Sequence, residues 1–295
     1  MASETTSKLN RLYQLLPEGL VVDAAWLEAK GYGHSLRQKY VANNWLESLA
    51  RGVFRRPVAR LSDAPTDRAP LDWQLVILSL QNLMRYGVSV GGRTALELQG
   101  FAHYLPARRE REVHLYTTER LPGWLAKLAI DATWRIHNAD RLFTSPGRGL
   151  SSVSVNLRTG AKHSADPTHG DSFTELSLGH WNWPLTVSTP ERAVLELVDE
   201  LPNRESFDQV DALLGGLGTL SPRRLQRLLE ACTSVKVKRL FLLLAERHNH
   251  AWFKRLERNR IDLGVGKRAL VEGGRLDPKY QITVPDSLLK QRDGL

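Results

Sequence analysis

The chain of 295 residues carries a formal net charge of +9, with 42% hydrophobic and 25% charged residues. These values are ordinary for a soluble globular protein of two domains. There is no run of about eighteen apolar residues, which excludes a membrane-spanning helix. A single cysteine excludes an internal disulfide framework and a multi-cysteine zinc site, and it indicates a reducing, cytoplasmic setting. The positive charge favours a polyanion or an acidic protein as the partner, without choosing between them.

The beginning of the chain shows the pattern of three helices followed by a hairpin. Leucines recur on one side of a predicted helix over residues 7–16, and Asp23 is placed to cap a second helix that ends at a glycine. A third helix and an arginine-bearing hairpin follow in the stretch HSLRQKYVANNWLESLARGVFRRP, from His34 to Pro57. This order predicts a complete winged helix-turn-helix domain in residues 1–62.

The third helix divides into an apolar and a polar side at a period of about 100° per residue. Leu36 and Tyr40 share the apolar side. Arg37 falls near that side, where it has to bond at the edge of the core. Gln38 and Lys39 lie on the polar side, so they are better candidates than Arg37 for reading bases.

The hairpin has arginines at its tip and along its second strand. Gly52 stands where a three-residue turn needs a left-handed residue, and Pro57 ends the second strand. Cations on such a wing meet phosphate at the flank of a DNA groove. An ordinary helix and hairpin with a solvated basic surface is the alternative. The predicted DNA-contacting residues are His34, Ser35, Arg37, Gln38, Lys39, Asn43, Arg51, Arg55 and Arg56.

A polar stretch with two prolines, residues 61–70, predicts a linker, and we place the boundary of the second domain (63–295) there. Near residue 188 the pattern of that domain changes to consecutive helices. The predicted helices span 72–86, 94–99 with Thr94 as N-cap, 122–129, 190–200, 206–214, 221–232 and 235–248. The predicted strands span 87–92, 111–117, 133–138, 141–144, 152–157, 268–271 and 280–284. The expected fold class is α+β, in which an N-terminal winged helix-turn-helix precedes a larger mixed α/β domain that ends in a helical region.

The stretch 221–268 is more basic than the N-terminal domain, because its net charge equals the +9 of the whole chain. A solvated face is one interpretation, and a surface for an acidic partner or additional nucleic acid is the other. Such a surface would be formed by Arg223, Arg224, Arg227, Lys236, Lys238 and Arg239. Cys232 lies among apolar residues and is interpreted as a small core residue rather than a catalytic thiol.

Two stretches look like sites for chemistry but lack what that chemistry needs. The turn GGRT at residues 91–94 is similar to the glycine turn of a nucleotidyltransferase, which requires carboxylates on the next strand to hold two metal ions. The strand at 113–116 has no carboxylate. The loop of residues 163–171 collects His and Asp residues without a helix or strand to position them. We therefore expect no catalytic residue, no metal and no cofactor, and we do not expect an enzyme.

Several stretches in order resemble one protein family. The segment LPEGLVVDAAWLEAKGYGHSLRQKYVANNWLESLARGVFRRP resembles the N-terminal domain of AbiEi-type antitoxins, which belong to abortive-infection, type IV toxin–antitoxin systems. The segments GGRTALELQG, STPERAVLELVDELP and DLGVGKRALVEGGRLDPKYQITVP are similar to the C-terminal domain of that family. The likeness covers nearly the whole chain.

The resemblance implies three properties beyond those indicated by composition. The winged helix would bind repeats in the promoter of its own operon, expected to be inverted repeats, and repress transcription. The C-terminal domain would carry the antitoxin activity, and the toxin would be a nucleotidyltransferase-like protein. The family's DNA-contacting region corresponds here to His34–Asn43 and the wing arginines. The alternatives are a transcriptional regulator without a toxin, whose second domain senses a ligand or dimerises, and an enzyme with a DNA-targeting domain.

Overall fold

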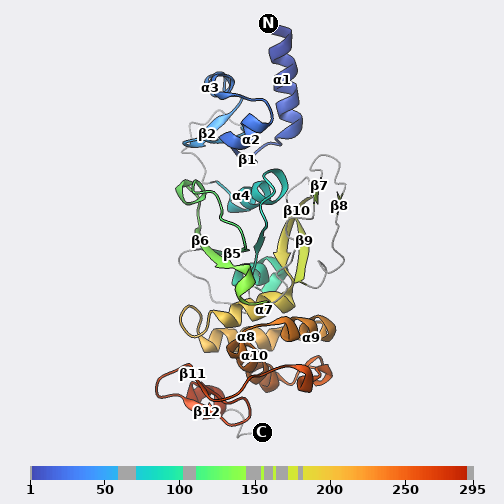
Figure 1. The fold of residues 1–295 in the computed structure, drawn as a ribbon, viewed down its shortest axis with the longest axis vertical. Coiled ribbons are helices and arrows are strands. Elements are labelled where there is room, and N and C mark those ends of the chain that lie inside the picture. The colour runs from blue at the N-terminus through green and yellow to red at the C-terminus, as the bar shows by residue number, and fades with distance from the viewer. Residues whose placement is uncertain are drawn as a thin grey trace.

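The computed structural model describes residues 2–58, 71–101, 111–143, 154–155, 162–163, 172–178 and 182–290. The N-terminal elements lie at one end of the long axis, a central sheet follows, and the C-terminal helices and strands form the other end (Figure 1). Within these residues no helix has the length and apolar character that crossing a membrane requires. The predicted α+β class, with a winged helix ahead of a mixed domain, is confirmed.

Three helices and a three-stranded sheet form the N-terminal unit. Its elements are α1 (Ala2–Leu15), β1 (Val21–Asp23), α2 (Ala24–Ala29), α3 (His34–Ala42), β2 (Glu47–Ala50) and β3 (Val53–Arg55). Helix α2 begins at Asp23, whose carboxylate accepts a 2.8 Å hydrogen bond from the backbone N–H of Trp26. Strand β3 lies in the middle of the sheet, antiparallel to both β1 and β2. This order of helices and strands is that of a winged helix.

The wing is the hairpin of β2 and β3. Its turn contains Arg51 and Gly52, and Gly52 has a φ of 76°, a left-handed conformation that glycine adopts without steric cost. The pairing shifts register between Ser48 and Ala50, so the first strand is bulged. The stretch 61–70, predicted to be a linker, lies outside the described residues.

A five-stranded mixed sheet occupies the middle of the molecule. Its strands are β4 (Val88–Val90), β5 (Glu112–Thr117), β6 (Thr133–Asn138), β9 (Phe173–Leu178) and β10 (Trp183–Ser188). Their order is β6-β5-β4-β10-β9, with parallel pairs β5–β6 and β4–β10. Helix α4 (Trp73–Leu78) follows its N-cap residue Asp72, where the predicted helix begins, and continues as a π-helical turn over Ser79–Leu83.

Three predictions for the central region need correction, and a fourth is tested only in part. Helix α5 (Gly92–Leu96) begins before Thr94, and the Thr94 hydroxyl instead accepts from the backbone N–H of His114 at 3.0 Å. The predicted helix at 122–129 is only a 3₁₀ turn, Leu125–Lys127. The predicted strand at 141–144 is replaced by a 3₁₀ turn (Ala139–Arg141) and a backbone bridge between Phe143 and Cys232. Within the strand predicted at 152–157, Ser154–Val155 form β7, which pairs with β8 (Lys162–His163), and the other residues of that prediction lie outside the described part of the chain.

The C-terminal third is helical and ends in a small sheet. The four predicted helices are α7 (Pro190–Asp199), α8 (Phe207–Gly216), α9 (Pro222–Ala231) and α10 (Val235–His248). Proline stands at the start of α7 and α9, where its missing N–H removes no helical hydrogen bond. The closing sheet has the order β11-β13-β12, from β11 (Arg268–Ala269), β12 (Arg275–Asp277) and β13 (Ile282–Val284), and α11 (Asp286–Lys290) follows. Strand β12 was not predicted.

Specific hydrogen bonds join the winged helix to the central domain. The backbone N–H of Val21 donates to the Ser79 hydroxyl at 2.8 Å, and the Trp26 indole N–H donates to the Leu83 carbonyl at 3.0 Å. The Trp124 indole donates to the Asp23 carboxylate at 3.2 Å. A continuous cluster of buried apolar residues runs through both parts. The two units therefore pack directly on each other.

Candidate nucleic-acid interface and histidine cluster

Helix α3 presents a polar face to solvent at the outer end of the molecule (Figure 1). Its inner side is held by Tyr40, which is fully buried and meets the Trp45 ring edge-on at a centroid distance of 5.3 Å. The predicted division of this helix into an apolar and a polar side is therefore confirmed. The exposed residues of this region are His34, Ser35, Gln38, Lys39, Ala42 and Asn43. Asn43 is partly engaged, because its side-chain amide donates to the Lys39 carbonyl at 2.7 Å.

Arg37 belongs to the interior of the winged helix rather than to its outer face. Only 6% of the residue is exposed, and its guanidinium donates to the Tyr32 carbonyl at 2.7 Å and lies 3.5 Å from the Glu28 carboxylate. The guanidinium thereby joins the loop after α2 to α3. We remove Arg37 from the DNA-contacting set, because a side chain in this position does not reach a groove.

The three wing arginines have different surroundings. Arg51 is exposed in the turn. Arg55 pairs with Glu47 on the neighbouring strand at 2.6 Å. Arg56 pairs with Glu18 at 3.0 Å and lies 4.1 Å from the centre of the Tyr13 ring. Both of these cations are half-buried and partly neutralised, so the exposed charge of the wing lies mainly at its tip.

Two of the six cations predicted to form a partner surface in the C-terminal stretch lie in the interior. Lys238 and Arg239 are buried, and the Arg239 guanidinium donates to the backbone carbonyls of Leu263, Gly264, Gly266 and Gln281. Lys236 donates to the Leu201 carbonyl at 2.9 Å and pairs with Asp199 at 3.2 Å. Arg224 lies 3.8 Å from Glu191, whereas Arg223 and Arg227 are exposed on α9. The predicted partner surface is therefore wrong for Lys238 and Arg239.

Cys232 is buried at the end of α9, as the sequence predicts for a core residue. Burial raises the pKa of its thiol to about 11, so the reactive thiolate is scarce near neutral pH. The side chains of the loop 163–171 lie outside the described residues, so the second candidate for metal chemistry is not placed.

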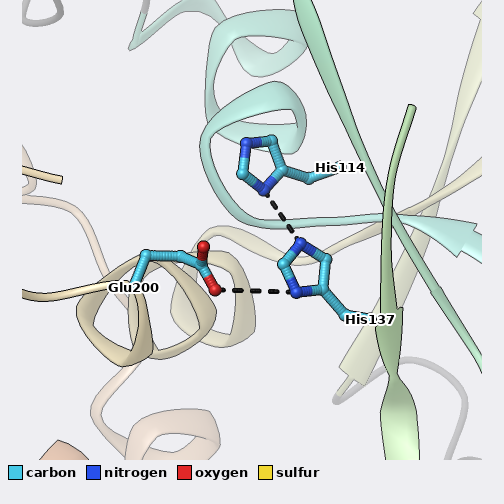
Figure 2. A group of neighbouring side chains, drawn as sticks. All are labelled: His114, His137 and Glu200. Carbon is cyan, nitrogen blue, oxygen red and sulfur yellow. Dashed lines mark hydrogen bonds and ion pairs between the residues drawn. The ribbon is translucent and has the colours of Figure 1, made fainter. Parts of the chain in front are cut away.

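A group of side chains that the sequence analysis did not identify lies between the central sheet and α7. His114 on β5 and His137 on β6 face each other, with His114 Nδ1 3.1 Å from His137 Nε2. The other ring nitrogen of His137, Nδ1, lies 3.5 Å from the Glu200 carboxylate at the end of α7 (Figure 2). The relevant signal is the register of two parallel strands, in which His114 and His137 are diagonal neighbours on one face. The spacing of the two histidines in the sequence does not reveal this register.

The surroundings of the histidines explain the double glycine of the GGRT turn. A Cβ atom at Gly91 would collide with the carboxylate of Glu196 and the ring of Tyr116. That carboxylate accepts from the backbone N–H of Gly92 at 2.8 Å and from Arg192 at 2.7 Å. The turn therefore allows α5, α7 and β5 to approach closely.

Burial controls the charge of His137. The pKa of His137 lies below its ordinary value because burial disfavours the imidazolium, although the carboxylates of Glu200 and Glu196 oppose that shift. The ring of Tyr116 stacks on His137 at a centroid distance of 4.6 Å, and burial raises the pKa of this phenol well above its ordinary value. The neutral form of His137 is therefore favoured at neutral pH, leaving a ring nitrogen that is able to accept a proton or bind a metal ion.

The fold and the exposed face of α3 define the class of a winged-helix transcriptional regulator with a large second domain. Two sequence models of one family match the chain. Residues 5–107 match the N-terminal domain of the transcriptional regulator AbiEi antitoxin, and residues 110–285 match the transcriptional regulator AbiEi antitoxin of type IV toxin–antitoxin systems. The chain belongs to this AbiEi antitoxin family.

One solved structure has a similar fold. The crystal structure of the Rv2827c protein from Mycobacterium tuberculosis is similar, with a TM-score of 0.53, 15% sequence identity, and coverage of 99% of this chain and 94% of that chain. This likeness concerns the fold alone. No curated protein sequence matches the chain.

Proposed function

We propose that this protein binds double-stranded promoter DNA through α3 and the wing, represses its own operon, and counteracts a nucleotidyltransferase-like toxin through its second domain. The observation that carries the DNA-binding part is the exposed polar face of α3, which carries Gln38 and Lys39 while the opposite side of the helix is fixed in the core. Membership of the AbiEi antitoxin family supports the antitoxin part. We expect the protein to carry out both activities in the cytoplasm.

The exposed side chains divide into two roles. Gln38 and Lys39 point from the middle of α3 and are suited to hydrogen bonds with base edges in the major groove. His34 and Ser35 occupy the first turn of α3, where backbone N–H groups also favour phosphate. Arg51 at the wing tip supplies a phosphate contact outside the groove. Arg55 and Arg56 contribute less, because each is already paired with a glutamate.

A quantitative gel shift with the DNA upstream of the coding region tests the DNA-binding part. The full-length protein is expected to bind an inverted repeat there more tightly than a scrambled duplex of equal length. The double variant Gln38→Ala/Lys39→Ala should lose that preference, because it removes the groups that read base edges. Arg223→Ala is the matched control, since it removes an exposed charge from α9, far from the wing. Equal binding of repeat and scrambled DNA by the wild type would contradict the proposal.

Repression and antitoxin activity are separable in the full-length chain. A reporter driven by the upstream DNA should be repressed by the wild type and released by Gln38→Ala/Lys39→Ala. Cells that express a neighbouring nucleotidyltransferase-like protein should be rescued by both, because the substitutions leave the second domain unchanged. Repression without any rescue would instead favour a regulator that has no toxin.

A further inference from the structure

The facing nitrogens of His114 and His137 have the separation of two ligands on one metal ion. Zinc–nitrogen bonds of about 2.0–2.1 Å in a tetrahedron place two ligand atoms about 3.3 Å apart. The Nδ1 of His114 and the Nε2 of His137 are 3.1 Å apart. His114, His137 and Glu200 each offer one ligand atom, and these three atoms lie within 4.8 Å of one another. Two imidazoles and a carboxylate are a ligand set typical of Zn²⁺.

We propose that His114, His137 and Glu200 bind one Zn²⁺ ion between the central sheet and helix α7. Their side chains converge from β5, β6 and the end of α7, as Figure 2 shows. The ion would join two strands to a helix that begins more than fifty residues after either of them in the sequence. Three protein ligands leave a fourth position for water or another small ligand.

Binding requires one proton and one side chain to move. The 3.1 Å approach of the two rings is a hydrogen bond that holds a proton between them. The ion takes the place of that proton, which moves to the other nitrogen of the ring that donated it, so both rings bind as neutral imidazoles. The Glu200 carboxylate then turns from the Nδ1 of His137 toward the ion, which shortens its distance to the ligand nitrogens. Its present cation partner is Arg204, at 3.3 Å, an exposed side chain that restrains the carboxylate little.

The surroundings favour an ion at this place. The exposed fraction is 2% for His114, 13% for the His137 side chain and 9% for the Glu200 side chain, so the ligands are held largely inside the molecule. Glu200 stands at the C-terminal end of α7, where the helix dipole disfavours an anion. A divalent cation offsets that charge. Tyr116 restrains the ring orientation of His137 by stacking.

The experiment measures metal binding by the full-length protein after removal of metal with a chelator. Zn²⁺ is titrated in competition with a chromogenic chelator, and Co²⁺ is added in parallel because its visible absorption reports four-coordinate geometry. We expect one ion per chain, a four-coordinate Co²⁺ spectrum and a higher thermal unfolding midpoint in the presence of Zn²⁺. His137→Gln and Glu200→Gln should weaken binding by about 100-fold or more.

Two controls separate this site from other histidines. His248→Gln removes a partly buried histidine that is 3.0 Å from Asp211, so it matches His137 in residue type and in having a carboxylate neighbour. His169→Gln removes a histidine from the loop that the sequence marks as a metal candidate. Both variants should bind Zn²⁺ as the wild type does. Far-ultraviolet circular dichroism of each variant checks that it is folded.

Several results would overturn the proposal. Absence of stoichiometric Zn²⁺ binding by the wild type would identify the three residues as a hydrogen-bonded chain only, and this result does not depend on any variant being folded. Unchanged affinity in folded His137→Gln and Glu200→Gln would place the ion elsewhere. The ion would also lie elsewhere if His169→Gln or His248→Gln lost Zn²⁺ binding while His137→Gln and Glu200→Gln kept it. The proposal does not rest on DNA binding, so its failure leaves the proposed function unaffected.

Discussion

Helices α3 and α10 are both rich in polar and cationic residues, yet their side chains have opposite environments. On α3, Gln38 and Lys39 are exposed at the outer end of the molecule. On α10, Lys238 and Arg239 are buried in the interior of the protein. Lys238 and Arg239 therefore add positive charge to the sequence of their stretch but not to a surface that a polyanion could contact. Exposure, rather than the density of charge along the chain, identifies the surface that is available to a partner.

Two buried arginines, Arg239 and Arg37, donate hydrogen bonds to backbone carbonyls. The loop before β11 has carbonyl groups without a helix or sheet to satisfy them, and the Arg239 guanidinium supplies several donors in a fixed planar array. Arg37 does the same on a smaller scale in the winged helix. The predictions below test this contrast between internal and exposed polar groups.

The largest effect is expected for Arg239→Met. This change leaves the carbonyls of Leu263, Gly264 and Gly266 without their donor, whereas the Gln281 carbonyl keeps the backbone N–H of Arg268. The free energy of unfolding should fall by about 3–5 kcal/mol. Urea unfolding followed by circular dichroism measures it. Arg223→Met on the exposed face of α9 is the control and should stay within about 0.5 kcal/mol of the wild type. Similar small losses for both would contradict the contrast.

Adjacent residues of α3 should respond in opposite ways. Arg37→Ala should lower the free energy of unfolding by about 1–3 kcal/mol, because it leaves the buried Tyr32 carbonyl without a donor. Gln38→Ala should leave stability within about 0.5 kcal/mol and weaken binding to the preferred duplex by about 1–3 kcal/mol. Paired unfolding and binding titrations measure both quantities. A specific binding defect in fully folded Arg37→Ala would return that residue to the interface.

The wing arginines test the contrast within one hairpin. Arg51→Ala should reduce by about one the slope of log affinity against log salt concentration, because one phosphate contact is lost. Arg56→Ala should change that slope less, since its charge is already paired with Glu18. Binding titrations at several salt concentrations distinguish the two. The reverse ranking would show that Arg56 leaves Glu18 when DNA binds.

The last and smallest expected effect is the slow reaction of the buried Cys232 thiol. With a pKa of about 11, the thiol is ionised to only about one part in a thousand at pH 8. An aromatic disulfide reagent should therefore react on the order of 100-fold more slowly with the native protein than with the protein in urea. Absorbance of the released thiolate measures the rate. Fast reaction of the native protein would show that this end of α9 opens readily.

Local signals predicted the helices of this protein well. Asp23, Asp72 and Ser221 are capping residues that begin helices where predicted, because their side chains satisfy the first backbone N–H groups. The period of α3 also predicted which side chains face the core, including the exceptional position of Arg37. Thr94 was assigned wrongly as a cap, because its hydroxyl bonds to a neighbouring strand instead. Such a bond depends on a distant partner.

The candidate sites also differ in whether they depend on local or on long-range contacts. The sequence alone determined the winged helix, its exposed helix face and its wing, because each depends on residues within a few positions of one another. Only the tertiary structure decided that Arg239 is buried, since carbonyl groups more than twenty residues later in the chain surround it. It also decided that His114, His137 and Glu200 meet, because strand register and the packing of α7 against the sheet bring them together. Neither long-range pairing leaves a periodic signal in the chain.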